Sequence, residues 1–507
     1  MTGNYARRAL EVFASYGDTE ALVAADGRRF TFGDMHDAIR DTAAALWQHG
    51  IRPGTTIGLL VTNSPESFFV QLAAHLIGCR TVFMVTNTPW VFLREVLPFV
   101  EADALVYEAD TVGQLGRDLA ALDPSMRMFS IGAGGLGPDL RDLPAVDQLP
   151  FRPEDITTEP ASLFQTSGTT GTPKLLQHGR GFFATVPYVA DFYRPADQPR
   201  IRHLSLSGGF RSGGQSAALM TWFAGGDFVL QAGMDIGAIL DTIGRERITS
   251  IHISPPLLYQ LLDDPRLADA DLSTLRSLTI CCAAASPARL AEAAKWFGRS
   301  LNVVYGMSEH PMISTFPDIG ADPARLASCG FPWHDTRVEI RDADRTALPA
   351  GRAGEIWVSG AMVTEGYWKR PDLNAENLVD GWLRTGDVGR FDAEGYLYIL
   401  DRITDMVVTQ IAGTMVYCRP LEDVLTGHPD VRQAAVVGVP DELFGEAPHA
   451  YVVPAPGATV TTDELRQLVV DQLSAEWAPR EVEFIDALPL TGAGKVDKKA
   501  LRARYLS

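Results

Sequence analysis

The sequence predicts an α/β protein: a large N-terminal domain of parallel-rich sheets with helices, followed by a small mobile α+β C-terminal domain. Apolar runs of strand length alternate with amphipathic helical periods through most of the chain. The 507 residues exceed what one hydrophobic core usually accommodates. The pattern also changes after Asp401, where a short set of strands and a helix follows. We therefore expect domains at residues 1–400 and 401–507, with a hinge near residues 401–405.

The first part of the chain predicts a βαβ unit. A helix over Asp34–Leu46 ends at His49-Gly50, where a glycine favours a helix stop. A buried strand at Thr56–Val61, a helix at Ser64–Ile77 and a strand at Thr81–Val85 follow. This order of elements implies that the two strands are parallel.

The same alternation returns in the middle of the chain. Here the expected helices are Asp235–Ile243 (closed by Gly244), Pro255–Leu262 and Pro287–Phe297, and the expected strands are Ser250–Ile253 and Leu278–Cys282. Gly354–Val358 and Gly395–Leu400 are typical of shorter, antiparallel strands. In the C-terminal domain we expect strands at Val431–Val439 and His449–Val453 and a helix at Asp463–Leu473.

Composition excludes several classes of function. The net charge of −19 argues against nucleic acid or an anionic membrane as partner. The apolar runs are far shorter than the ~18 residues that a membrane span needs, and the N-terminus lacks the pattern of a signal peptide. The scattered cysteines lack metal-ligand spacing and predict reduced core residues of a cytoplasmic protein. They are Cys79, Cys281, Cys282, Cys329 and Cys418.

The most informative segment is Phe-Gln-Thr-Ser-Gly-Thr-Thr-Gly-Thr-Pro-Lys at residues 164–174. Glycines let backbone N–H groups approach an anion, and hydroxyls and an ammonium add further donors. The segment therefore predicts a phosphate-binding loop, with a polar surface turn as the alternative. It is not a Walker loop, because only two residues separate Gly168 from Gly171. The expected binding residues are Thr166, Ser167, Gly168, Thr169, Thr170, Gly171 and Lys174.

This string resembles the phosphate-binding loop of the adenylate-forming superfamily, which includes acyl- and aryl-CoA synthetases, adenylation domains and luciferases. Four further blocks occur in the family's order and spacing, so the resemblance covers nearly the whole chain. They are Tyr305-Gly306-Met307-Ser308-Glu309, Arg384-Thr385-Gly386-Asp387, Asp401-Arg402-Ile403-Thr404-Asp405 and Gly492-Ala493-Gly494-Lys495.

The resemblance implies ATP and Mg²⁺ as cofactors and gives each block a role. Glu309 would bind Mg²⁺, although alone it would be read as a surface carboxylate. Tyr305 would stack on adenine, with a core tyrosine as the alternative, and Ser308 replaces the family's usual Thr. Asp387 would accept the ribose hydroxyls and Arg402 would reach ribose or phosphate. The expected catalytic residues are Lys495, Glu309 and Lys174, with Lys495 contacting both the carboxylate and the α-phosphate.

The acid-binding pocket is expected to be lined by Phe210, Arg211, the Cys282–Ser286 segment with Ala283 and Ala284, and the Tyr305–Ser308 segment with Gly306. Phe210 takes the position of the family's aromatic gate. Arg211 falls where many relatives contact the substrate, so it indicates a polar or second anionic group on the acid, unless its side chain faces solvent. Aryl, short polar and medium acyl acids all stay open.

Two departures from the family bear on the acceptor. The stretch Thr409–Thr414 is about two residues longer than in relatives, Ala412 replaces one glycine of a Gly-Gly pair, and Thr404 occupies the hinge position. Because glycines allow close backbone approach, we expect weak use of CoA with adenylation intact.

The predicted function is an AMP-forming ligase that activates a small-molecule carboxylic acid and transfers it to a thiol, either CoA or the pantetheine of a carrier protein. Alternatives are a biosynthetic enzyme with a non-thiol acceptor, such as an amine or nitrite, and a non-catalytic nucleotide-binding homologue. The presence of the expected catalytic residues and of Asp387 and Arg402 argues against the last.

Overall fold

The computed structural model describes residues 4–86, 90–165, 174–192, 200–206, 209, 211–408, 415–441, 445–491 and 495–506. The predictions for Thr166, Ser167, Gly168, Thr169, Thr170, Gly171 and Phe210, and for the loop Thr409–Thr414, lie outside these residues.

Within the described ranges, one sheet has seven strands in the order β18-β8-β7-β4-β3-β5-β6. The strands are β3 (Thr56–Val61), β4 (Arg80–Val85), β5 (Ala104–Glu108), β6 (Arg127–Ile131), β7 (Ala161–Gln165), β8 (Leu175–His178) and β18 (Gly366–Tyr367). Strand β3 pairs in parallel with both β4 and β5. All its residues are buried, as expected for a parallel strand covered on both faces. The predicted βαβ unit is confirmed.

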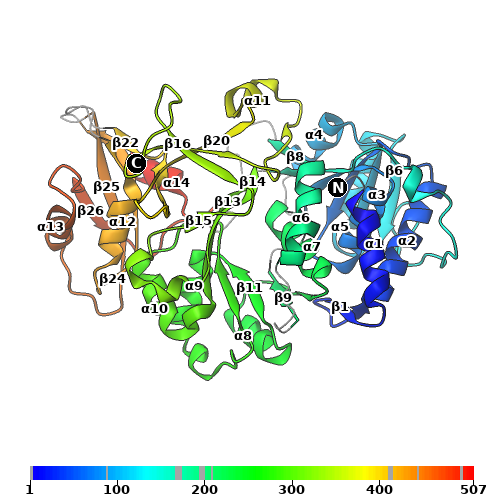
Figure 1. Cartoon of the computed structure of the whole chain (residues 1–507), viewed down its shortest axis with the longest axis horizontal. Coiled ribbons are helices and arrows are strands. Elements are labelled where there is room, and N and C mark those ends of the chain that lie inside the picture. Colours follow the sequence, from blue (N-terminus) through cyan, green and yellow to red (C-terminus); the bar gives the residue numbers. More distant parts are fainter. Residues whose placement is uncertain are drawn as a thin grey trace.

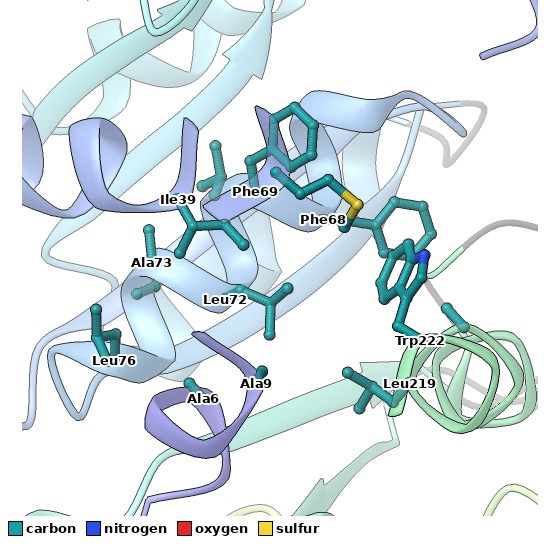
Figure 2. Packing of buried hydrophobic residues seen from close by; sticks show 14 of the residues in the cluster. Ala6, Ala9, Ile39, Phe68, Phe69, Leu72, Ala73, Leu76, Leu219 and Trp222 are labelled. Carbon is teal, nitrogen blue, oxygen red and sulfur yellow. The ribbon is translucent and has the colours of Figure 1, made fainter. Parts of the chain in front are cut away.

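Helix α3 (Pro65–Leu76) is the centre of the packing beside this sheet. It begins with a proline at its first position and is buried along its whole length. Its neighbours are α1 (Tyr5–Tyr16), α2 (Phe32–Gln48) and α7 (Ser212–Phe223). Figure 2 shows Phe68 of α3 against Trp222 of α7. The rings of Phe68 and Trp222 meet edge to face at 5.2 Å, so aromatic packing joins the first sheet region to the next.

A second sheet has nine strands in the order β15-β14-β13-β12-β11-β9-β10-β1-β2. They are β1 (Glu20–Val23), β2 (Arg29–Thr31), β9 (Arg202–Ser205), β10 (Asp227–Leu230), β11 (Ser250–Ile253), β12 (Ser277–Ile280), β13 (Leu301–Met307), β14 (His310–Phe316) and β15 (Phe331–Pro332). The run from β1 through β13 is parallel, while β14 returns antiparallel to β13. The ends of β12 and β13 therefore point the same way, toward the candidate site.

A third, antiparallel sheet joins β16 (Arg337–Arg341), β17 (Gly354–Ser359), β19 (Leu378–Val379), β20 (Trp382–Phe391) and β21 (Leu397–Arg402). The remaining helices before it are α4 (Trp90–Val100), α5 (Ala109–Leu122), α6 (Arg180–Phe192), α8 (Ile236–Arg245), α9 (Pro255–Asp263) and α10 (Pro287–Phe297), and α11 (Pro371–Asn377) lies between β17 and β19.

The C-terminal part is a small α+β unit. Its strands are β24 (Val431–Asp441), β25 (Gly445–Pro454) and β26 (Glu481–Phe484), and a short pair is formed by β22 (Val407–Val408) and β23 (Met415–Val416). Its helices are α12 (Cys418–Thr426), α13 (Thr462–Gln472) and α14 (Lys498–Tyr505). Figure 1 shows this unit at one end of the molecule and α1 to α3 at the other. The domain limits at residues 1–400 and 401–507 stay a prediction.

Local signals explain where the bounds differ from those predicted. Helix α2 starts two residues early because Thr31 and Asp34 form a capping box. Helix α8 continues one residue past Gly244 to Arg245. Strand β21 starts after Gly395, whose φ of 88° places it in the preceding turn. In the described part of the chain, no helix combines the length and apolar character needed to cross a bilayer.

The prediction that all five cysteines lie in the core is wrong for one of them. Cys79, Cys329 and Cys418 are buried and Cys281 is partly buried, but Cys282 is exposed. Strand β12 ends at Ile280, two residues before the predicted end, so Cys282 lies beyond the buried part of the sheet.

Candidate active site

Asp387 is the best-fixed polar side chain of the candidate site. It lies on β20 opposite Arg402 of β21 in the antiparallel register. The Tyr305 hydroxyl donates to Asp387 Oδ2 at 2.6 Å, and Arg402 Nε lies 3.0 Å from Oδ1. Asp387 is only 4% exposed, so both contacts are largely shielded from water. Three predicted residues from separate strands therefore form one group, joined by a hydrogen bond and an ion pair.

The pKa values around Asp387 reflect this arrangement. Burial and the neighbouring carboxylate raise the pKa of Tyr305 well above its usual value, so the tyrosine stays a neutral donor. The Asp387 charge raises the pKa of Arg402. A buried carboxylate held by a phenol and a guanidinium keeps further lone pairs for a ligand such as a diol.

Glu309 lies in the turn between β13 and β14. Its Oε1 accepts a hydrogen bond from the Tyr367 hydroxyl at 2.9 Å, and its backbone carbonyl accepts from Thr364 N at 2.7 Å. Burial raises the pKa of Glu309. The segment around Tyr367 thus fixes the orientation of the predicted metal ligand.

The neighbouring Ser308 is held through its backbone. His178, at the end of β8, lies with Nε2 2.7 Å from the Ser308 carbonyl. Burial lowers the pKa of His178 to about 4, so its imidazole is neutral near pH 7. Lys174 directly precedes β8. The strand that follows the predicted phosphate loop is therefore tied to the Tyr305–Glu309 segment.

Lys495 belongs to the C-terminal unit, yet its electrostatic surroundings are those of the candidate site. Burial, followed by the positive charge of Arg402, lowers its pKa, whereas Cys282 and Asp387 act in the opposite direction. Its carbonyl accepts a hydrogen bond from Thr491 N at 2.7 Å, which closes a tight turn. The fold therefore brings Lys495 into the field of Asp387 and Arg402, although it lies far from them in the sequence.

Contacts between α12 and the segment after β12 hold the C-terminal unit in this position. Ser286 Oγ donates to Thr426 Oγ1 at 2.8 Å in a buried contact, and Arg419 Nη2 donates to the Ala285 carbonyl at 2.9 Å. Arg432 of β24 forms an ion pair with Asp263 of α9. These contacts join the unit that carries Lys495 to the segment predicted to line the acid pocket.

The predicted pocket residues lie at the ends of their elements. Arg211 is the N-cap of α7 and is exposed, and Ala283 and Ala284 are exposed in the segment after β12. Gly306 lies within β13, where a Cβ atom would come within 2.0 Å of the Pro311 carbonyl oxygen, so only glycine fits. After burial and Arg402, the positive charge of Arg211 also lowers the pKa of Lys495, which places Arg211 in the same electrostatic environment.

Sequence reasoning missed two residues of this site. His178 and Tyr367 position Ser308 and Glu309, but neither belongs to a chemical motif. Cys282 belongs to the segment predicted to line the acid pocket, and it interacts electrostatically with both Lys495 and Arg211. Its position at the end of a predicted parallel strand suits such a pocket, because ligands of open α/β sheets bind at that edge.

Comparison with known proteins shows which family this chain belongs to. Residues 10–368 match the model of the AMP-binding enzyme family, and residues 420–495 match the model of the AMP-binding enzyme C-terminal domain. The chain therefore belongs to the AMP-binding enzyme family, and the resemblance seen in the motifs is confirmed. It is an ATP-dependent ligase of the AMP-forming type.

Particular relatives cover nearly the whole chain. The medium/long-chain-fatty-acid–CoA ligase FadD8 of Mycobacterium tuberculosis is 34% identical over 94% of this chain and 86% of its own length. The structure of the amide bond synthetase McbA from Marinactinospora thermotolerans matches with a TM-score of 0.88 and 35% identity over 99% of both chains. ATP-bound MatB from Rhodopseudomonas palustris matches with a TM-score of 0.85 and 25% identity over 100% of this chain and 99% of its own. The α/β fold class is thereby confirmed.

Proposed function

We propose that this ligase first joins a small-molecule carboxylic acid to ATP, forming an acyl- or aryl-adenylate and pyrophosphate. In a second step the acyl group passes to an acceptor. The observation that carries the proposal is the convergence of Asp387 and Arg402, which lie between the two matched family domains, with Lys495 at the end of the second.

Each residue has a role that suits its chemistry. Asp387 accepts the ribose hydroxyls, since its carboxylate is fixed by Tyr305 and Arg402. Lys495 neutralises charge on the carboxylate and the α-phosphate during adenylation. The segment Thr166–Lys174 holds the phosphates, and Lys174 directly precedes the strand β8 that is bonded through His178 to Ser308.

Glu309 fits the role of a Mg²⁺ ligand. Carboxylate oxygens suit this hard cation, and Tyr367 fixes one of the two oxygens. Among the described residues, no group of three or more His, Cys, Asp or Glu side chains is arranged to hold a metal. Mg²⁺ would therefore be shared between Glu309, phosphate oxygens and water. When bound, the ion would reduce the negative charge on the phosphates.

The first candidate acceptor is a thiol, CoA or carrier-protein pantetheine, because FadD8 is described as a CoA ligase. A second candidate, an amine, is favoured by the match to the amide bond synthetase, which covers 99% of both chains. The longer Thr409–Thr414 stretch, predicted to fit pantetheine poorly, favours the amine.

The test is acid-dependent pyrophosphate exchange over a panel of aryl, short polar and medium acyl acids. The best acid is then incubated with CoA, carrier protein or amines, and the product masses are compared. Exchange with at least one acid is expected. An absence of exchange across a broad panel, with ATP binding intact, would contradict adenylation. Efficient thioester formation at micromolar CoA would exclude an amine as the preferred acceptor.

A further inference from the structure

Cys281 and Cys282 form a pair of adjacent thiols at the edge of the candidate site. They directly follow β12, and their Sγ atoms are 3.5 Å apart. Strand β12 is parallel to both β11 and β13. This is the carboxyl edge of the parallel strands, where open α/β sheets bind their ligands.

The backbone of Cys282 has an uncommon conformation. Its φ of 72° lies in the left-handed region, which non-glycine residues seldom occupy. Such strain persists where the surrounding structure enforces it, often at functional sites. Here the next residues are held by the contacts of Ala285 and Ser286 with α12. Cys282 is exposed while Cys281 is partly buried, so reagents reach Cys282 first.

The two thiols differ in charge. The hydrogen bond with Cys281, and then the positive charges of Lys495 and Arg211, lower the pKa of Cys282 to about 6. The pKa of Cys281 is raised. Burial also raises the pKa values of the other three cysteines, Cys79, Cys329 and Cys418. The thiol of Cys282 therefore loses its proton more readily than that of Cys281.

We propose that Cys282 and Cys281 are a thiol-oxidation site in which Cys282 reacts with a hydroperoxide and Cys281 resolves the product as a vicinal disulfide. The Cys282 sulfur attacks one peroxide oxygen, the O–O bond breaks and hydroxide or alkoxide leaves, giving a sulfenic acid. The sulfur is oxidised by two electrons and the peroxide is reduced.

Cys281 completes the reaction. Its sulfur attacks the Cys282 sulfur, the S–O bond breaks, and the hydroxyl leaves as water with the proton of the Cys281 thiol. The sulfurs must approach from 3.5 Å to about 2 Å, which requires side-chain rotation. The disulfide removes the thiolate that interacts with Lys495.

The test uses the full chain treated with hydrogen peroxide, followed by intact and peptide mass analysis. Wild type should lose two hydrogen atoms within the peptide carrying Cys281 and Cys282, and a dithiol reductant should restore them. Cys281→Ser should instead gain one oxygen on Cys282, trapped by a sulfenic-acid reagent. Cys282→Ser should show neither change, while the buried-cysteine control Cys79→Ser should behave as wild type.

A second measurement needs no disulfide. The rate of Cys282 alkylation should rise with pH through a midpoint near 6, the pKa lowered by Cys281, Lys495 and Arg211. Oxidation confined to other cysteines, no change of mass, or an alkylation midpoint near the ~8.5 of a free thiol would overturn the proposal. These readouts do not depend on turnover, so they stand apart from the test of adenylation.

Discussion

The two halves of the candidate site are held together by different means. On the side of Asp387, β21 of the same sheet places Arg402 on the carboxylate and β13 of the second sheet places Tyr305 there, so an ion pair and a hydrogen bond hold the geometry. On the side of Lys495, the residues Lys495, Cys282 and Arg211 come from three separate elements and interact mainly through their charges. The docking of α12 near Ser286 sets the position of Lys495 relative to the other two. The first half is therefore built into the sheets, whereas the second depends on where the C-terminal unit lies. With the roles proposed above, this difference separates nucleotide binding from catalysis of adenylation.

The largest expected effect tests the half that depends on docking. Lys495→Ala should reduce adenylate formation by a few orders of magnitude, since a charge-assisted contact in the transition state contributes ~3–4 kcal/mol. Transfer from a pre-formed adenylate should persist. The measurement is pyrophosphate exchange alongside single-turnover transfer, with exposed Lys499→Ala of α14 as the control. Equal loss of both half-reactions would contradict the assignment.

The second prediction concerns the half built into the sheet. Asp387→Ala should weaken ATP binding by about 2–3 kcal/mol, because a charged hydrogen-bond acceptor is lost. The affinity for the acid should change little. Titration calorimetry with ATP measures this, and Asp344→Ala at an exposed position is the matched control. An unchanged ATP affinity would remove Asp387 from the nucleotide site.

Low pH should reduce the stability of the folded protein through His178. Burial lowers its pKa to about 4, below the ordinary value of 6.5, so the unfolded chain binds the proton more readily. Its contribution is complete above pH 6.5 and is lost as pH falls toward 4. From pH 7 to pH 5 the loss should be about 2 kcal/mol.

Urea unfolding at the two pH values measures this loss. His178→Gln, which keeps a donor for the Ser308 carbonyl, should lose less stability than wild type over the same interval. The other buried histidines still titrate in this variant and provide the background. If both proteins lose the same stability, His178 is not responsible.

The smallest effect is expected at the docking contact. Ser286→Ala removes the hydrogen bond to Thr426 and should cost about 1 kcal/mol of docking, as one neutral hydrogen bond does. Pyrophosphate exchange should fall by less than tenfold while the ATP affinity stays unchanged. Ser273→Ala, in the loop before β12, is a suitable control. A matching loss of ATP affinity would show that the two halves are not separable.

Prediction from the sequence succeeded where local pattern and chemistry coincide. Helices such as Pro287–Phe297 and strands such as Thr56–Val61 have the predicted bounds, because periodicity and a proline or a buried run mark them. Tyr305, Asp387, Arg402 and Lys495 were found through motifs, and the structure brings them together. Their roles in binding and catalysis stay predictions.

What the sequence by itself determined is the family, the fold class and the charged residues of the site. Only the tertiary structure decided which partners fix them: His178 on Ser308, Tyr367 on Glu309, and Thr426 on Ser286. These contacts join residues far apart in the chain, so no local periodicity encodes them. The exposure and charge of Cys282 were likewise invisible, because they depend on the backbone after β12 and on Lys495 from the other end of the protein.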